Sequence, residues 1–251
     1  MFVSSRIARM STTSDAPGSS PQPGDPLASR SRSTRGRPAK SPLSAEAIVE
    51  AALAICREET LDAVTMRRVA AELDTGPASL YVYVRNREEL VRQMLDRVSG
   101  DVALEEVDPA RWREQVHELV ERWLRAMEAH PGLASVAVGN PPATERMMVV
   151  ADHLMALLLA GGVTPQDAAW AIDILPLITT ATAVETDVHR ARGHTGEETV
   201  QRIEATLAAM PADRLPNLLR YGSELVSGDG DQRFHFAIEV FLAGLVARAS
   251  T

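Results

Sequence analysis

The 251-residue sequence contains a single cysteine and no long apolar run. Cys56 lies on the apolar face of a predicted helix, and a lone core thiol suits a reducing cytoplasm. The most apolar stretch, residues 168–184, includes Asp173 and Pro176, so no run approaches the roughly 20 residues of a membrane span. The N-terminus lacks the apolar segment of a secretory signal. We therefore expect a cytoplasmic protein with one or two buried cores.

The sequence also lacks the residue patterns of known catalytic sites. It contains no Ser-His-Asp arrangement, no P-loop and no Gly-rich phosphate motif. Glu185 and His189 are spaced to share a helix face, as are His235 and Glu239, but neither pair has a third ligand at metal spacing. We therefore predict no catalytic residue, no metal and no cofactor, with a small-molecule enzyme as an alternative class.

Charge is distributed unevenly along the chain, whose net charge is −8. Residues 1–42 carry +5, residues 43–100 carry −3 and residues 101–251 carry −10. The first segment is rich in Ser, Pro, Gly, Thr and Arg and has almost no large apolar residues. It therefore cannot bury enough apolar surface to offset the loss of conformational entropy on folding. We expect residues 1–42 to be a disordered basic extension, whose local potential matters more to an anionic partner than the total charge.

Residues 65–97 have the layout of a helix-turn-helix, which reads the major groove of DNA. Thr65 can cap a short helix, and residues 74–76 interrupt its pattern. Pro77 suits the first position of the next helix, where a missing N–H costs nothing, and Asn86 can cap a longer third helix. The order of cap, turn, short helix and capped helix therefore predicts a DNA-binding domain.

The run 80–84, LYVYV, followed by Asn86-Arg87, resembles the LYxHF-x-x-K segment of the TetR family of one-component bacterial repressors. The resemblance covers about 60 residues and includes a helix predicted from Ser44 to about residue 59. Asp74 stands where the family usually has Gly, and Tyr83 stands where His is common. Because Asp tolerates a left-handed backbone better than most residues, we expect the turn to be kept.

The resemblance implies which side chains meet DNA. The residues that it carries over are Thr65, Arg67, Ala78, Ser79, Tyr81, Tyr83 and Arg87. The first two would meet phosphates at a helix N-terminus, the next two would reach base edges, and the last three would contact the backbone. The alternative is that both tyrosines only cover a core formed by Leu80 and Val84.

Arg35-Gly36-Arg37-Pro38 resembles the core of an AT-hook. A compact Arg-Gly-Arg segment can lie in a narrow A·T minor groove, which makes Arg35 and Arg37 candidate DNA contacts. The alternative is a solvated basic tail with a diffuse electrostatic effect. A nucleoid-type architectural DNA-binding protein that uses this tail alone is a further class, and it would show no sharp operator and no release by a ligand.

The rest of the sequence predicts helices separated by short breaks, without β alternation. The predicted segments are 112–127, 147–160, 165–192, 196–210, 212–222 and 232–249. The expected fold is all-α, with a three-helix helix-turn-helix domain at 43–88 and a larger helical domain at 89–251. Thr164 caps the long segment, in which Pro176 is an expected kink.

Residues 168–188 are apolar nearly all round, as expected of a central core helix or of a helix that gives a second face to a partner subunit. The TetR resemblance favours the second reading, because members of that family dimerise through a four-helix bundle made from their last two long helices. We therefore expect a homodimer held by the helix at 165–192 and the last helix, and a charge placed at Leu242 should yield monomers if that position lies in the seam.

The larger domain is expected to hold a small-molecule pocket between its helices. Large adaptable side chains and polar groups on otherwise apolar helices are the candidate ligand contacts, and each has a core or surface position as its alternative. These candidates are Trp112, Trp123, Met127, Met147, His153, Trp170, Asp173 and His189. The sequence thus predicts a ligand-responsive regulator, most simply a repressor that a small-molecule effector releases from a palindromic DNA operator.

Overall fold

The computed structural model describes residues 43–138, 144–193, 196–211 and 213–249. Within these ranges every regular element is helical and no strand occurs, which confirms the all-α prediction. The predicted basic extension, with Arg35 and Arg37, lies outside the described residues.

The N-terminal helices begin where the sequence places their caps. They are α1 (Ala45–Glu58), the 3-10 turn η1 (Leu61–Ala63), α2 (Met66–Glu72) and α3 (Pro77–Leu80). The hydroxyl of Ser44 accepts the N–H of Ala47 at 3.1 Å, and that of Thr65 accepts the N–H of Arg68 at 3.1 Å. Each cap satisfies a donor that the first turn leaves unpaired, so both predicted helix starts are confirmed.

The turn between α2 and α3 keeps its shape although Gly is absent from its first position. Asp74 has φ of 50°, the one positive φ among the described residues other than glycine. Asp is among the few side chains that reach this left-handed conformation at small cost. Pro77 occupies the first turn of α3, as predicted.

Helix α4 (Arg87–Gly100) connects the N-terminal helices to the rest of the chain. The side chain of Asn86 caps it by accepting the N–H of Glu89 at 2.8 Å. Its buried residues include Leu90, Met94 and Val98. Helix α4 packs against α1 and also against α5, α6 and α7. A displacement of α4 would therefore change contacts both with the N-terminal helices and with the larger helical region.

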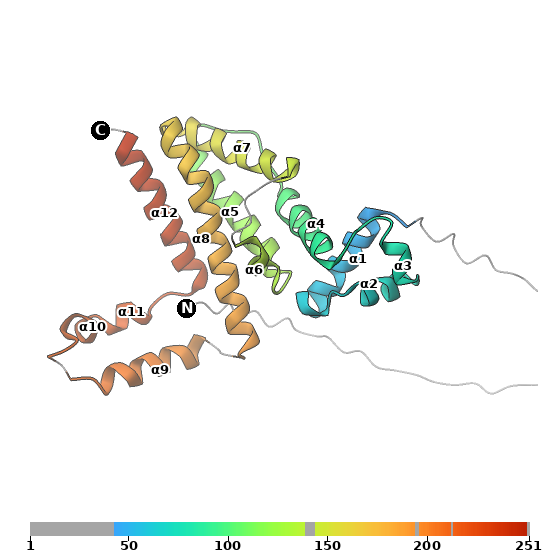
Figure 1. The fold of residues 1–251 in the computed structure, drawn as a ribbon. Coiled ribbons are helices and arrows are strands. Elements are labelled where there is room, and N and C mark those ends of the chain that lie inside the picture. The colour runs from blue at the N-terminus through green and yellow to red at the C-terminus, as the bar shows by residue number, and fades with distance from the viewer. Residues whose placement is uncertain (1–42, 139–143, 194–195, 212, 250–251) are drawn as a thin grey trace, which may run out of the picture. The chain divides into compact units, whose positions relative to one another are not determined.

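The larger helical region is built around α5 and α8. Its principal helices are α5 (Trp112–Glu128), α6 (Leu133–Ala137), α7 (Glu145–Ala160), α8 (Pro165–Ala191) and α12 (Gly230–Ala249). Helix α8 runs beside α5 and α12 (Figure 1) and also packs against α6 and α7. Fully buried Val116, Leu157, Leu175 and Ile238 contribute to the core that these helices share.

Helix α8 is the longest described helix, with 27 residues. Thr164 caps it by accepting the N–H of Asp167 at 3.2 Å, and Pro165 follows at the first helical position, as predicted. Pro176 lies inside the helix without ending it. Of the helices described, only α8 is long and apolar enough to cross a membrane. It packs against α5, α6, α7 and α12.

Three helices, α9 (Gly196–Ala208), α10 (Pro216–Arg220) and α11 (Gly222–Val226), lie between α8 and α12 in the sequence. They pack against one another, and none contains a buried residue (Figure 1). The segment predicted at 212–222 ends at Arg220, because Tyr221 leaves the helical conformation with φ of −117°.

Candidate DNA-binding surface and effector cavity

The short helix α3 exposes the side that a recognition helix would turn to DNA. Leu80 is fully buried against its own domain, and Val84 is 1% exposed. Ala78 is exposed and Ser79 is half-buried. Leu80 and Val84 therefore hold α3 against the domain core, and Ala78 and Ser79, which are predicted to reach base edges, stay accessible.

The two tyrosines after α3 remain largely exposed. Tyr81 is 52% exposed and Tyr83 is 40% exposed, while Leu80 and Val84 fill the core without them. Val82, between the tyrosines, is 80% exposed, and sequence reasoning did not select it. An apolar side chain flanked by two aromatic rings on an exposed turn has no packing role within the described chain, so Val82 joins this candidate surface.

Neighbouring arginines at the start of α2 have different surroundings. Arg68 is paired with Glu72 at 2.7 Å and with Glu59 at 3.4 Å. Arg67 is exposed and makes no hydrogen bond or ion pair with another described residue. Thr65, at the cap, is exposed as well. Arg67 is therefore the cation of this pair that is available to a phosphate.

Arg87 binds the main chain of its own domain. Its Nε donates to the carbonyl of Val64 at 2.7 Å, and its Nη2 donates to the carbonyl of Leu61 at 2.7 Å. Both carbonyls belong to the turn between η1 and α2, so Arg87 ties the start of α4 to that turn. The sequence did not predict this structural role, because it depends on a contact between residues more than 20 positions apart.

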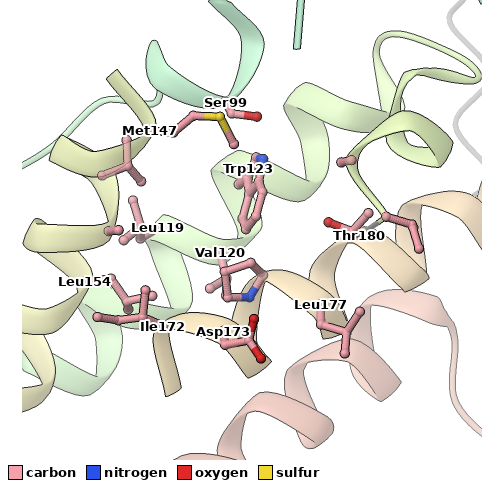
Figure 2. A pocket seen from close by; sticks show the side chains of 15 residues that line it. Ser99, Leu119, Val120, Trp123, Met147, Leu154, Ile172, Asp173, Leu177 and Thr180 are labelled. Atoms are coloured by element: carbon pink, nitrogen blue, oxygen red, sulfur yellow. The ribbon is translucent and has the colours of Figure 1, made fainter. Parts of the chain in front are cut away.

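A cavity of about 310 Å³ lies between α4, α5, α6, α7 and α8. Its wall is mostly apolar, with side chains such as Leu119, Val120, Leu154 and Ile172 (Figure 2). A volume and lining of this kind fall within the range of small-molecule sites. The polar side chains of the wall are Ser99, Trp123, Asp173 and Thr180.

Three of the predicted ligand contacts line this cavity, namely Trp123, Met147 and Asp173. The other five do not line it. Trp112 is buried against Gly161, and Met127 is fully buried in the core. His153 is half-buried on α7, Trp170 is 56% exposed on α8, and His189 lies 3.8 Å from Glu185 near the end of α8. Helical spacing identified all eight residues as candidate ligand contacts, but it does not show which neighbouring helix each side chain faces.

Sequence reasoning missed Ser99, which reaches the cavity from α4 and is 4% exposed. The available signal was a polar residue on the apolar stripe of α4, four positions after Leu95. Neither Ser99 Oγ nor Trp123 Nε1 has a hydrogen-bond partner in the described part of the chain, although both atoms are buried. Most buried polar groups in proteins are paired, so two unpaired ones in one cavity wall require an explanation.

The turn between α5 and α6 contacts the N-terminal helices. The carbonyl of Pro131 accepts the N–H of Leu61 at 2.9 Å and is approached by the thiol of Cys56 at 3.6 Å. Arg57 Nη1 donates to His130 Nε2 at 3.2 Å. Burial lowers the pKa of His130, which fits a neutral ring that accepts from arginine.

The same turn is bound to α8 on its other side. The N–H of Gly132 donates to Asp187 Oδ2 at 2.7 Å. Gly132 has φ of 90°, and a Cβ there would lie 3.0 Å from Leu61 Cβ, so the position requires glycine. Burial raises the pKa of Asp187, while the bond from Gly132 and the charge of Arg190 oppose that rise. One tight turn thus connects α8 with η1 of the helix-turn-helix region.

Helices α8 and α12 also carry exposed apolar side chains. On α8 these include Trp170 at 56% and Ile174 at 38%, and on α12 they include Phe236 at 70% and Val240 at 54%. Leu242 is fully buried within the chain, so the prediction that it lies in a subunit seam is wrong. Phe236 and Val240, one helical turn apart, are large apolar residues of α12 that a partner could reach.

Comparisons with known proteins agree with this geometry. Residues 48–94 match the family described as bacterial regulatory proteins, tetR family, and residues 107–249 match the tetracyclin repressor-like C-terminal domain. The chain is 30% identical to the HTH-type transcriptional repressor DrrR1 of Streptomyces coeruleorubidus, over 84% of this chain and 82% of that repressor.

Solved structures of ActR from Streptomyces coelicolor are also similar to this chain. The apo structure has a TM-score of 0.75 at 37% identity and covers 84% of this chain and 98% of ActR. The complex with actinorhodin has a TM-score of 0.75 at 38% identity and covers 82% of this chain and 97% of ActR. This chain belongs to the TetR family of bacterial DNA-binding transcriptional regulators.

Proposed function

We propose that this regulator is a homodimeric repressor that leaves its operator when a small molecule fills the cavity between α4 and α8. The observation that carries the proposal is the position of α4, which supplies Ser99 to the cavity wall and packs against α1. A ligand that favours one position of α4 would therefore bias the spacing of the two DNA-binding heads. Such coupling typically changes affinity by roughly 5–150-fold. The complex of the similar ActR with actinorhodin supports a small-molecule ligand.

On the DNA side, we assign residues 43–88 to the helix-turn-helix domain and residues 89–251 to the effector and dimerisation domain. Arg67 and Tyr81 are proposed as phosphate contacts because both are exposed and not needed in the core. Ser79 and Val82 are proposed to face base edges, where a hydroxyl and an apolar group read different features. The domain is proposed to act in the cytoplasm, where the operator is found.

For the dimer, a second copy of the chain is proposed to cover the exposed apolar faces of α8 and α12. The exposed apolar residues recur at helical spacing on each of these two adjacent helices, and apolar surface of this kind marks an interaction site. A two-fold arrangement presents two recognition helices to half-sites about one helical turn apart, which accounts for a palindromic operator.

Selection from random double-stranded DNA with the purified full chain tests this function. The expected product is one enriched palindrome, and fluorescence anisotropy should then show that one dimer binds it with steep salt dependence. Equal binding of all sequences would instead indicate an architectural DNA-binding protein and would refute the proposed repressor.

A further inference from the structure

The cavity wall carries one ionisable side chain, and that side chain is acidic. Asp173 is the only Asp, Glu, Lys, Arg or His among the described lining residues. It is exposed and forms no ion pair with another described residue. A ligand in this cavity would therefore meet a free negative charge and no compensating positive one, which disfavours a carboxylate and favours an amine.

The wall also carries two buried hydrogen-bond donors that have no partner in the described chain. Trp123 Nε1 can only donate, and it is buried without a partner in the described chain. Ser99 Oγ, which can donate as well, is also buried and unpaired there. Leaving buried donors unpaired is unfavourable, so a ligand oxygen that accepts from them would gain affinity and specificity.

These polar groups lie at separate places around the cavity. In Figure 2 the indole nitrogen of Trp123 points toward Ser99, and the Asp173 carboxyl group lies away from them, beyond the indole ring. In this view the indole ring and Val120 lie between them, and the apolar side chains of Leu154 and Ile172 line the wall to one side. A mostly apolar wall that includes an indole ring, with two donors at one place and a carboxylate at another, fits an aromatic molecule that carries both an acceptor and a cation.

We propose that the effector is a planar aromatic carbonyl compound that carries a protonated amine. Its carbonyl oxygen accepts from Trp123 Nε1 and Ser99 Oγ, its ring system stacks along the apolar wall, and its ammonium group pairs with Asp173. The same carboxylate repels aromatic acids of equal size. This inference rests on the proposed effector role of the cavity and specifies the charge of the ligand.

Three anthraquinones of one size but different charge serve as probes: 2-(aminomethyl)-, 2-(hydroxymethyl)- and 2-carboxy-anthraquinone. Isothermal titration calorimetry with the full chain at pH 7 and low salt should rank them amine, alcohol, acid in falling affinity. Because Asp173 is exposed, each step should be about three- to fivefold. Raising the salt concentration should compress the series, since screening weakens an exposed charge pair.

Asp173→Asn should bring the three affinities together without lowering the melting temperature. Asp152→Asn is the matched control, because Asp152 is an exposed acid of α7 outside the cavity wall. Trp123→Phe keeps an aromatic ring but removes the donor, so it should weaken all three probes about three- to tenfold without changing their order. Tyr221→Phe likewise removes a donor from an aromatic side chain, but at an exposed position outside the cavity, so it should leave the affinities unchanged.

Equal affinities in the native chain, tighter binding of the acid, or an unchanged ranking in Asp173→Asn would each overturn the inference. Failure of all three probes to bind would overturn it too. Operator selection and anisotropy, which need no effector, decide separately whether the proposed repressor function stands.

Discussion

The main-chain N–H of Gly132 donates to the carboxylate of Asp187 across 2.7 Å, and so binds the turn between α5 and α6 to helix α8. The adjacent carbonyl of Pro131 accepts the N–H of Leu61, in η1 of the DNA-binding region. The wall of the cavity and the helix-turn-helix are therefore joined by two short hydrogen bonds at consecutive residues. This route runs beside the direct packing of α4 on α1.

We predict that Asp187→Ala lowers the free energy of unfolding by about 1–2 kcal/mol, because the buried N–H of Gly132 loses its acceptor. Asp187→Asn should lose less, since its amide oxygen still accepts and no charge is desolvated. Thermal denaturation at pH 7 measures both. The raised pKa of Asp187 means that its contribution is greatest below its usual pKa and falls as pH rises through the raised value. A wild-type pH profile of stability that matches that of Asp187→Asn would contradict this assignment.

Arg87→Ala is expected to lower the melting temperature as well as operator affinity. The substitution removes two hydrogen bonds to the carbonyls of Leu61 and Val64, a loss of about 1–3 kcal/mol. Differential scanning calorimetry gives the change, and Arg85→Ala is the control, because the Arg85 side chain is 79% exposed and, among the described residues, pairs with Glu89 alone. An unchanged melting temperature would mean that these bonds are not made in solution.

Arg67→Ala should weaken operator binding without lowering stability. Loss of one phosphate contact reduces the slope of log affinity against log salt by about 0.9 per subunit. Arg68→Ala is the matched control, since Arg68 is already paired with Glu59 and Glu72 and should change the slope less. Fluorescence anisotropy across a salt series compares the two. A larger slope change for Arg68→Ala than for Arg67→Ala would show that Arg68, and not Arg67, contacts the phosphate.

Phe236→Asp should convert the dimer to monomers while each subunit stays folded. Phe236 is 70% exposed in the single chain, so an acid there costs no core packing but cannot be buried in a seam. Sedimentation velocity at micromolar concentration reports the change. Met148→Asp, at a 55% exposed apolar position of α7, is the control that should remain dimeric. A persistent dimer of the Phe236 variant would place the seam elsewhere.

Cys56 should resist alkylation until the chain unfolds. Burial raises the pKa of its thiol to about 11, so the reactive thiolate is scarce at pH 8. Because the folded pKa lies above the unfolded value of about 9, the associated stability is present below pH 9 and is lost as pH rises toward 11. Mass spectrometry after iodoacetamide treatment, with and without denaturant, measures the reaction. Rapid modification of the native chain would show that the packing around Cys56 opens.

The sequence by itself determined the features that local chemistry controls. The caps at Ser44, Thr65 and Asn86 were predictable because each side chain bonds an N–H three residues away. The turn at Asp74 followed from the small set of residues that adopt positive φ. These short-range constraints also set the order of the DNA-binding helices, and helical periodicity without β alternation predicted the all-α class.

Only the tertiary structure decided which faces meet. A helical stripe shows that Leu242 and Phe236 are apolar, but burial of the first and exposure of the second depend on where α5 and α8 lie. For the same reason Ser99 belongs to the cavity and Trp170 does not. Side-chain spacing fixes the neighbours along one helix, whereas contacts between helices depend on how several apolar faces pack at once, which no single segment encodes.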